Sequence, residues 1–154
     1  MKVLVVGKGG REHAIVKKLA RDGISDISAA PGNAGMNDVA TLVDIADDNV
    51  AALADFAQDN GIDLTIVGPE SALMAGIADE FSARGLPVFG PERAGAILEG
   101  SKAFSKALMA KYGIPTAAYA EFTSLPEALS YLQNGSFPIV IKADGLAAGK
   151  GVII

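Results

Sequence analysis

Residues 7–13, with the sequence GKGGREH, combine glycines with the basic side chains of Lys8 and Arg11. Glycine lets a backbone approach a ligand closely and expose its N–H groups. A helix beginning near Gly10 would add the positive end of its dipole, which attracts anions. These features predict a phosphate-binding loop. The alternative is a tight strand-to-helix turn in which the glycines serve only to reverse the chain.

Short polar or glycine-rich segments also follow the next apolar runs, at residues 31–35 (PGNAG), 68–70 (GPE) and 90–92 (GPE). In a parallel α/β sheet, ligands gather outside the carboxyl ends of the strands. Asn33 alone indicates turn chemistry, and Glu70 alone could be a solvated or helix-capping carboxylate. Their shared position at strand ends favours contact with a ligand, and Glu70 is suited to a cationic or hydroxyl-rich group.

A second loop with chemical potential lies at residues 143–151 (ADGLAAGKG). Lys142 precedes it at the end of an apolar strand, and the loop itself offers Asp144 and Lys150. Glycine N–H groups can fold over a polyphosphate while lysines neutralise its charge. The alternative is an ordinary hairpin tip with solvated lysines, although structural hairpins need only about two to five loop residues. Lys102, taken alone, reads as an exposed surface lysine.

Two familiar nucleotide patterns fit poorly. The dinucleotide fingerprint requires a third glycine where this sequence has Glu12, and an acidic residue should end the second strand, which instead ends in AAP. A Walker loop fails because Asp144 replaces its first glycine and Gly151 stands where a serine or threonine should hold magnesium. His13 is the only histidine, so no histidine pair can hold zinc. A structural role and a substrate contact are equally open for it.

The elements that position these loops follow from hydrophobic periodicity. Short apolar runs predict strands at residues 3–6, 24–30, 64–67 and 88–89. Helical spacing predicts helices at residues 12–22, 49–60 and 73–84. This alternation indicates an α/β fold with a parallel sheet and helices on both faces.

The pattern changes near residue 100. A helix capped by Ser101 is expected at residues 101–112, a strand at 118–122 and a helix at 124–132. Apolar strands at 138–142 and 152–154 would form an antiparallel hairpin around the second loop. The sequence stops inside the last of these strands, so we expect it to be part of a longer protein.

The composition excludes several functional classes. The chain has 154 residues, a formal charge of −5 and no cysteine. No overall positive field attracts nucleic acid or anionic lipid, and disulfides and thiolate metal sites are impossible. No signal segment precedes the first strand and no apolar run is long enough to span a membrane, so a cytoplasmic location is expected.

Taken together, several segments resemble the phosphoribosylamine–glycine ligase family, also called glycinamide ribonucleotide synthetase. They are residues 7–13 (GKGGREH), 30–35 (APGNAG), 65–70 (TIVGPE), 98–102 (LEGSK) and 141–152 (IKADGLAAGKGV). Their order and spacing are far more specific than a single glycine loop. The resemblance implies a Rossmann-like pre-ATP-grasp domain at residues 1–100, a linking helix and linker at 101–117, and the beginning of an ATP-grasp α+β subdomain at 118–154.

The resemblance also implies site residues. The phosphoribosylamine side would be formed by Gly9, Gly10, Arg11, Glu12, His13, Pro31, Gly32, Asn33, Gly35, Gly68, Pro69 and Glu70. ATP would be contacted by Lys102, Lys142, Asp144, Gly145, Gly149, Lys150 and Gly151.

The activity implied is the ATP-dependent ligation of 5-phosphoribosylamine and glycine through a glycyl phosphate, in purine biosynthesis. ATP and Mg²⁺ would be needed, with the metal ligands and adenine pocket beyond residue 154. We therefore expect these 154 residues alone to lack ligase turnover. Small molecules are the expected partners, not nucleic acid or membrane. The alternatives are another ATP-grasp carboxylase or ligase, such as a biotin carboxylase-like protein, and a non-catalytic nucleotide-binding module.

Overall fold

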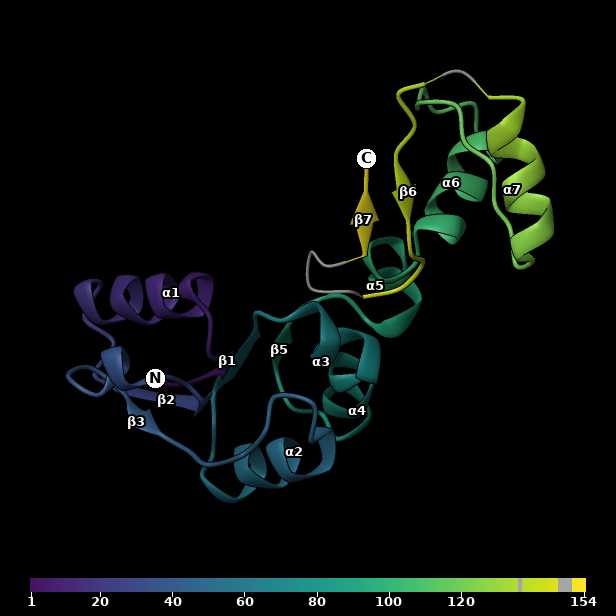
Figure 1. Cartoon of the computed structure of the whole chain (residues 1–154). Coiled ribbons are helices and arrows are strands. Elements are labelled where there is room, and N and C mark those ends of the chain that lie inside the picture. Colours follow the sequence, from purple (N-terminus) through teal and green to yellow (C-terminus); the bar gives the residue numbers. More distant parts are fainter. Residues whose placement is uncertain (136, 147–150) are drawn as a thin grey trace. The chain divides into compact units, whose positions relative to one another are not determined.

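The computed structural model contains two compact units, residues Met1–Ala96 and Ile97–Ile154, and each is described here by itself (Figure 1). The structure describes residues 1–135, 137–146 and 151–154. Gly149 and Lys150, both predicted to contact ATP, lie outside the described residues.

The first unit is built on a five-stranded parallel sheet with the strand order β3-β2-β1-β4-β5. Its strands are β1 (Lys2–Gly7), β2 (Asp26–Pro31), β3 (Thr41–Leu42), β4 (Leu64–Val67) and β5 (Val88–Phe89). Every neighbouring pair is parallel, and Val5 of the central strand pairs with Ala29 on one side and Ile66 on the other. The predicted α/β fold with a parallel sheet is therefore confirmed.

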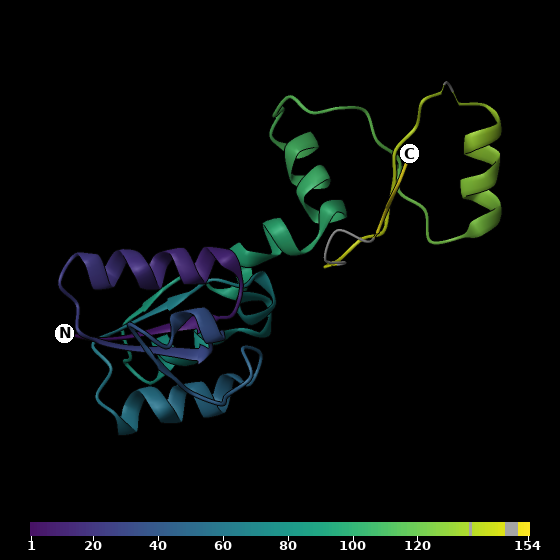
Figure 2. The same cartoon turned by 60° about the vertical axis from the view of Figure 1, so that its left-hand side comes forward.

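Helices cover both faces of this sheet, as Figure 2 shows for α1 (Gly10–Arg21) and α2 (Val50–Asp59). The central strand supplies both cores because its side chains alternate between the faces. Val3 and Val5 pack on the α1 side, in a cluster with Val16. Leu4 and Val6 face the opposite way, toward the α2 side.

The predicted helix at residues 73–84 is two helices, α3 (Glu70–Ala75) and α4 (Ile77–Ala83). Gly76 separates them in the left-handed conformation, with φ of 91°. A glycine in this conformation ends α3, and α4 begins directly after it. The apolar spacing of the sequence continues across Gly76, so periodicity alone predicted a single helix. Three further elements were not predicted: β3, the 3-10 turn η1 (Ala34–Met36) and α5 (Arg93–Gly100). The first two elements are too short for periodicity to detect.

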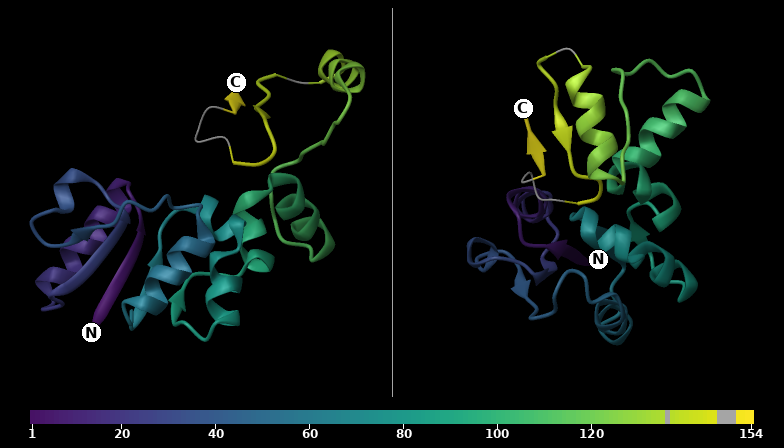
Figure 3. Two further views of the ribbon diagram at one scale, coloured as in Figure 1. Left: turned by 90° about the horizontal axis from the view of Figure 1, so that it is seen from below. Right: turned by 45° about the vertical axis from the view of Figure 1, so that its right-hand side comes forward.

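The second unit contains α6 (Lys102–Lys111), α7 (Leu125–Gln133), β6 (Ile141–Lys142) and β7 (Val152–Ile153). The predicted cap of α6 is confirmed, because the Ser101 hydroxyl accepts a hydrogen bond from the amide of Phe104 at 3.1 Å. The predicted hairpin is also confirmed: β6 and β7 are antiparallel, with Lys142 opposite Val152 (Figure 3).

The strand predicted at residues 118–122 is wrong. These residues are exposed and form no strand in the structure. A strand is stable only when its N–H and C=O groups pair with a neighbour, and the apolar composition of the segment carried no information on such a partner. Among the helices that the structure describes, none has the length and apolar character required to cross a membrane.

Candidate functional site

The loops after β1, β2 and β4 lie at the carboxyl edge of the parallel sheet. The amide of Gly32 donates to the carbonyl of Gly7 at 3.2 Å, and the amide of Gly68 donates to the carbonyl of Val6 at 3.1 Å. Strand pairing thus continues into the loops and brings them together. The shared edge on which the ligand prediction depends is present.

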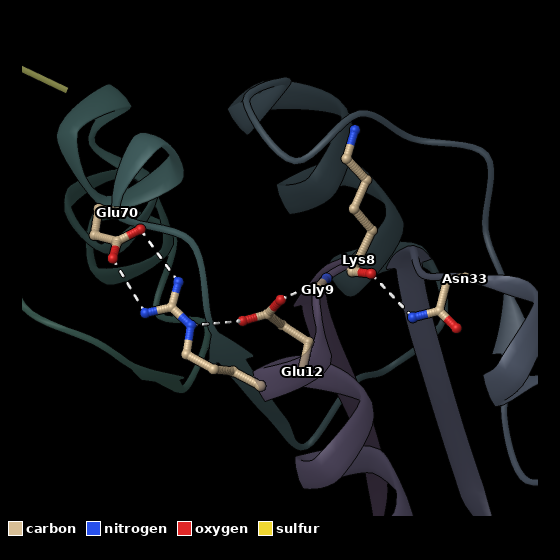
Figure 4. A network of polar contacts seen from close by, with 6 residues as sticks. Lys8, Gly9, Glu12, Asn33 and Glu70 are labelled. Carbon is tan, nitrogen blue, oxygen red and sulfur yellow. Dashed lines mark hydrogen bonds and ion pairs between the residues drawn. The ribbon is translucent and has the colours of Figure 1, made fainter. Parts of the chain in front are cut away.

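The centre of this edge is the carboxylate of Glu12, in the first turn of α1. The residue is only 3% exposed. Its Oε2 accepts a hydrogen bond from the amide of Gly9 at 2.7 Å, and its Oε1 lies 3.7 Å from Nε of Arg11 (Figure 4). The positive end of the helix further favours a negative charge here. Glu12 is therefore a buried carboxylate that the chain itself places at this edge.

Glycines surround this carboxylate because no larger residue would fit. A Cβ at Gly68 would lie 2.2 Å from Oε1 of Glu12, and one at Gly9 would lie 2.8 Å from Oε2. Gly7 adopts φ of +121°, and its Cβ would meet Cγ of Glu12 at 2.7 Å. The sequence departs from the dinucleotide pattern at position 12, and the structure shows that the glutamate occupies space that these glycines leave open.

Arg11 and Glu70 link the loop after β1 to the start of α3. The guanidinium donates from both terminal nitrogens to the two carboxylate oxygens, at 3.1 and 3.2 Å. The Arg11 hydrogen bonds lower the pKa of Glu70, helped by a backbone N–H, while partial burial opposes the shift. Arg11 remains 67% exposed, so a ligand can still reach it. Arg11 and Glu70 were both predicted to contact a substrate, and in the structure they form an ion pair with each other.

Asn33 links the loop after β2 to the loop after β1. Its amide nitrogen donates to the carbonyl of Lys8 at 2.9 Å, and its side-chain oxygen accepts from the amide of Gly35 at 2.9 Å. The bond to Gly35 is the turn chemistry predicted for Asn33, and the bond to Lys8 is a contact between two loops. His13 packs over Gly35, where a Cβ would lie 2.6 Å from the ring. This contact gives His13 a structural role, and its substrate contact stays a prediction.

The remaining predicted residues border the same edge. Gly10 begins α1 beside open space, Pro31 ends β2, Gly32 has φ of +66° and Pro69 caps α3. Gly7 was not among the predicted site residues, although it borders the Glu12 carboxylate. The feature of the sequence that could have identified Gly7 is Glu12, which replaces the third glycine of the dinucleotide pattern. A side chain of this size at that position requires small residues around it.

A second group of predicted residues meets in the other unit, at the start of α6. One oxygen of the Asp144 carboxylate accepts from the amides of Lys102 and Ala103, at 2.7 and 3.1 Å, and the other accepts from the Ser101 hydroxyl at 3.0 Å. These bonds lower the pKa of Asp144, with the Ala103 amide as the largest cause. Nζ of Lys102 donates to the carbonyl of Gly145 at 3.0 Å.

Strand pairing places the other members of this group. Lys142 ends β6, and the amide of Ala143 donates to the carbonyl of Gly151 at 2.8 Å. The link between Ser101 and Asp144 was missed, because distant residues give no periodic signal. Among the described residues, no cluster of three or more histidine, cysteine or acidic side chains could hold a metal ion.

Comparisons with known proteins identify the same family along the whole chain. Residues 1–99 match the family model for the phosphoribosylglycinamide synthetase N domain, and residues 100–154 match the model for its ATP-grasp (A) domain. The phosphoribosylamine–glycine ligase of Caldanaerobacter subterraneus subsp. tengcongensis is 54% identical over 155 residues, which cover 100% of this chain and 37% of that protein. The chain thus spans little more than a third of that curated relative.

Two solved structures are similar to this chain over nearly its whole length. The crystal structure of phosphoribosylamine–glycine ligase from Thermotoga maritima matches with a TM-score of 0.76 and 34% identity, over 99% of this chain and 35% of that chain. The biotin carboxylase domain of the Hydrogenobacter thermophilus 2-oxoglutarate carboxylase matches with a TM-score of 0.74 and 21% identity, over 99% and 36% of the two chains. The second likeness shows a shared fold alone.

The packing around Glu12 predicts that Gly68→Ala destabilises the first unit. The added methyl group overlaps a buried carboxylate, and overpacking of this kind costs about 1–3 kcal/mol. Urea unfolding followed by circular dichroism measures the loss. Gly10→Ala is the matched control, because no atom lies within 4 Å of its added Cβ. Equal stability of the two variants would contradict this account of the glycine.

The Arg11–Glu70 pair predicts a pH dependence. Because the pKa of Glu70 is lowered in the folded state, its stabilising contribution is present above the unfolded value of about 4.3 and is lost as the pH falls through the folded value. The pair is exposed, so the effect on stability stays below about 1 kcal/mol. A carboxyl NMR titration should show the pKa of Glu70 rising in Arg11→Gln. It should not move in Lys18→Gln, which removes the same charge farther along α1, and an unmoved midpoint in both variants would exclude the pairing.

Proposed function

Since this chain belongs to the phosphoribosylglycinamide synthetase family, we propose that it forms the sugar-phosphate-binding part and the first section of the ATP-binding part of a phosphoribosylamine–glycine ligase. We divide it as residues 1–100 for the amino-terminal substrate domain, 101–117 for the linking helix and linker, and 118–154 for the beginning of the ATP-grasp subdomain. A cytoplasmic location belongs to the same proposal, as do small molecules as the only substrates.

The proposed reaction has two steps. An oxygen of the glycine carboxylate attacks the γ-phosphorus of ATP and releases ADP, which leaves a glycyl phosphate. The amine of 5-phosphoribosylamine then attacks the acyl carbon, and phosphate and a proton leave as glycinamide ribonucleotide forms. Chemistry of this kind depends mainly on positioning and charge neutralisation, which loops and lysines supply.

The arrangement of the loops carries the proposal for the sugar phosphate. Asn33 and the Arg11–Glu70 pair join three loops at one edge of the sheet. Around the first turn of α1, Lys8, Gly10 and Arg11 are exposed. Backbone N–H groups and cations beside a helix N-terminus suit a phosphate group. The Glu70 carboxylate is suited to a sugar hydroxyl or to the amine.

For the nucleotide, the proposal rests on Lys102, Lys142 and the loop between β6 and β7. The two lysines would neutralise phosphate oxygens as point charges, and the glycine-rich loop would cover them. ATP therefore fits the residues present. Mg²⁺ would neutralise phosphate charge, and we propose that its ligands lie in the part of the ligase that the curated relative has in addition to the length matched here.

The sugar-phosphate site predicts a loss of affinity in Arg11→Ala. Removing a charge-assisted hydrogen bond costs about 1.5–3 kcal/mol, or roughly 10- to 100-fold in the dissociation constant of ribose 5-phosphate. Titration calorimetry on the 154-residue chain measures it. Lys18→Ala is the control, because it removes a cation from the far end of the same helix. An unchanged constant in Arg11→Ala would remove the first loop from the site.

The reaction itself is tested by product analysis on a ligase of full family length that carries this sequence. With ATP and phosphoribosylamine, we expect glycine to be consumed and glycinamide ribonucleotide to appear together with ADP. Bicarbonate serves as the control acceptor, because the shared fold of the biotin carboxylase domain makes carboxylation the competing activity. ADP release that depends on bicarbonate and not on glycine would refute the proposed function.

A further inference from the structure

The carboxylate of Asp144 lies where the second loop leaves strand β6, two residues after Lys142. It is bonded to the first residues of α6, the helix that begins with Lys102. Its Oδ1 accepts two backbone amides and its Oδ2 accepts the Ser101 hydroxyl. Both oxygens of the carboxylate are therefore engaged by one helix start.

This helix start is capped twice. Ser101 provides the local cap, since its hydroxyl accepts the amide of Phe104 while donating its own proton toward Asp144. A helix leaves its first N–H groups without partners, and Asp144 accepts two of them, from Lys102 and Ala103. A negative charge at this end is also favoured by the helix dipole. The second cap comes from a distant loop, so it fixes the loop as well as the helix.

The contact runs in both directions. The side chain of Lys102 reaches back to the carbonyl of Gly145, the residue after Asp144. On the other side, Lys142 is fixed by its pairing with Val152, and Ala143 donates to Gly151. The two proposed nucleotide lysines are thus joined through a short, continuous set of bonds that passes through Asp144.

We propose that Asp144 is a positioning residue that fixes the base of the loop to α6 and thereby sets Lys102 and Lys142 relative to each other for a nucleoside triphosphate. It does so through the helix start and does not itself contact the nucleotide, which revises the role expected from the sequence. This inference rests on the proposed function, since it assigns the two lysines to ATP.

The test uses the full-length ligase that carries this sequence. Asp144→Ala should raise KM for ATP by about tenfold or more, because hydrogen bonds to a charged group are lost, while KM for glycine changes less than about twofold. The KM for ATP of Asp144→Asn should lie between those of the unmodified enzyme and Asp144→Ala, because the amide oxygen of asparagine can still accept the Lys102 and Ala103 amides. Glu121→Gln, which removes an exposed carboxylate from the same unit, is the matched control. Equal losses for ATP and glycine in Asp144→Ala would overturn the positioning role.

A second measurement separates the link from the reaction. In the 154-residue chain, hydrogen exchange at the amides of Lys102 and Ala103 should accelerate in Asp144→Ala and stay unchanged in Glu121→Gln. If these amides are unaffected, the link is absent and the inference fails whatever the enzyme does. If they lose protection while KM for ATP is unchanged, positioning is refuted and the proposed function stands. An enzyme without glycine-dependent turnover would refute the function even when the amides show the link.

Discussion

The loop edge of the first unit is shaped around one buried carboxylate, that of Glu12. A carboxylate removed from water needs compensating partners, and Glu12 has the amide of Gly9 on Oε2 and the positive end of α1. Its Oε1 accepts no hydrogen bond from the described residues and lies 3.7 Å from Nε of Arg11. It also needs room, which Gly7 and Gly68 provide by lacking side chains. The loops after β1 and β4 therefore cannot be changed independently, because both are shaped around the same group.

The same carboxylate bears on the choice of ligand. In dinucleotide-binding folds, a third glycine lets α1 pack closely and the pyrophosphate lies at its N-terminus. Here Glu12 occupies this region and already accepts the Gly9 amide. The proposed sugar phosphate would instead meet the exposed side chains of Lys8 and Arg11 beside the open space at Gly10. Exposed cations beside a helix start that already carries its own carboxylate suit the single phosphate of the proposed sugar-phosphate ligand better than the pyrophosphate of a dinucleotide.

The sequence was sufficient for the features that depend on local pattern. The unbroken apolar run of β1 indicated a strand buried on both faces, and strand–helix alternation indicated which loops would share an edge. It was insufficient where distant residues decide the outcome. The Arg11–Glu70 pair and the Asp144 cap depend on distances that no local pattern contains. The apolar segment at 118–122 failed as a strand because no pattern shows whether a partner is present, and Gly76 interrupted a helix without interrupting its periodicity.

Each unit has a carboxylate at the start of a helix: Glu12 at α1 and Asp144 at α6. The two caps differ in where the carboxylate comes from and in how far it is buried. Glu12 belongs to the helix that it caps and is buried, so its bond to Gly9 persists as long as α1 does. Asp144 comes from a loop and is exposed, so water competes for each of its bonds. Loss of the Asp144 cap would still leave α6 with its local Ser101 cap. Glu12 therefore shapes the loop edge of the parallel sheet from within its own helix, whereas Asp144 joins the start of α6 to the residues that directly follow β6.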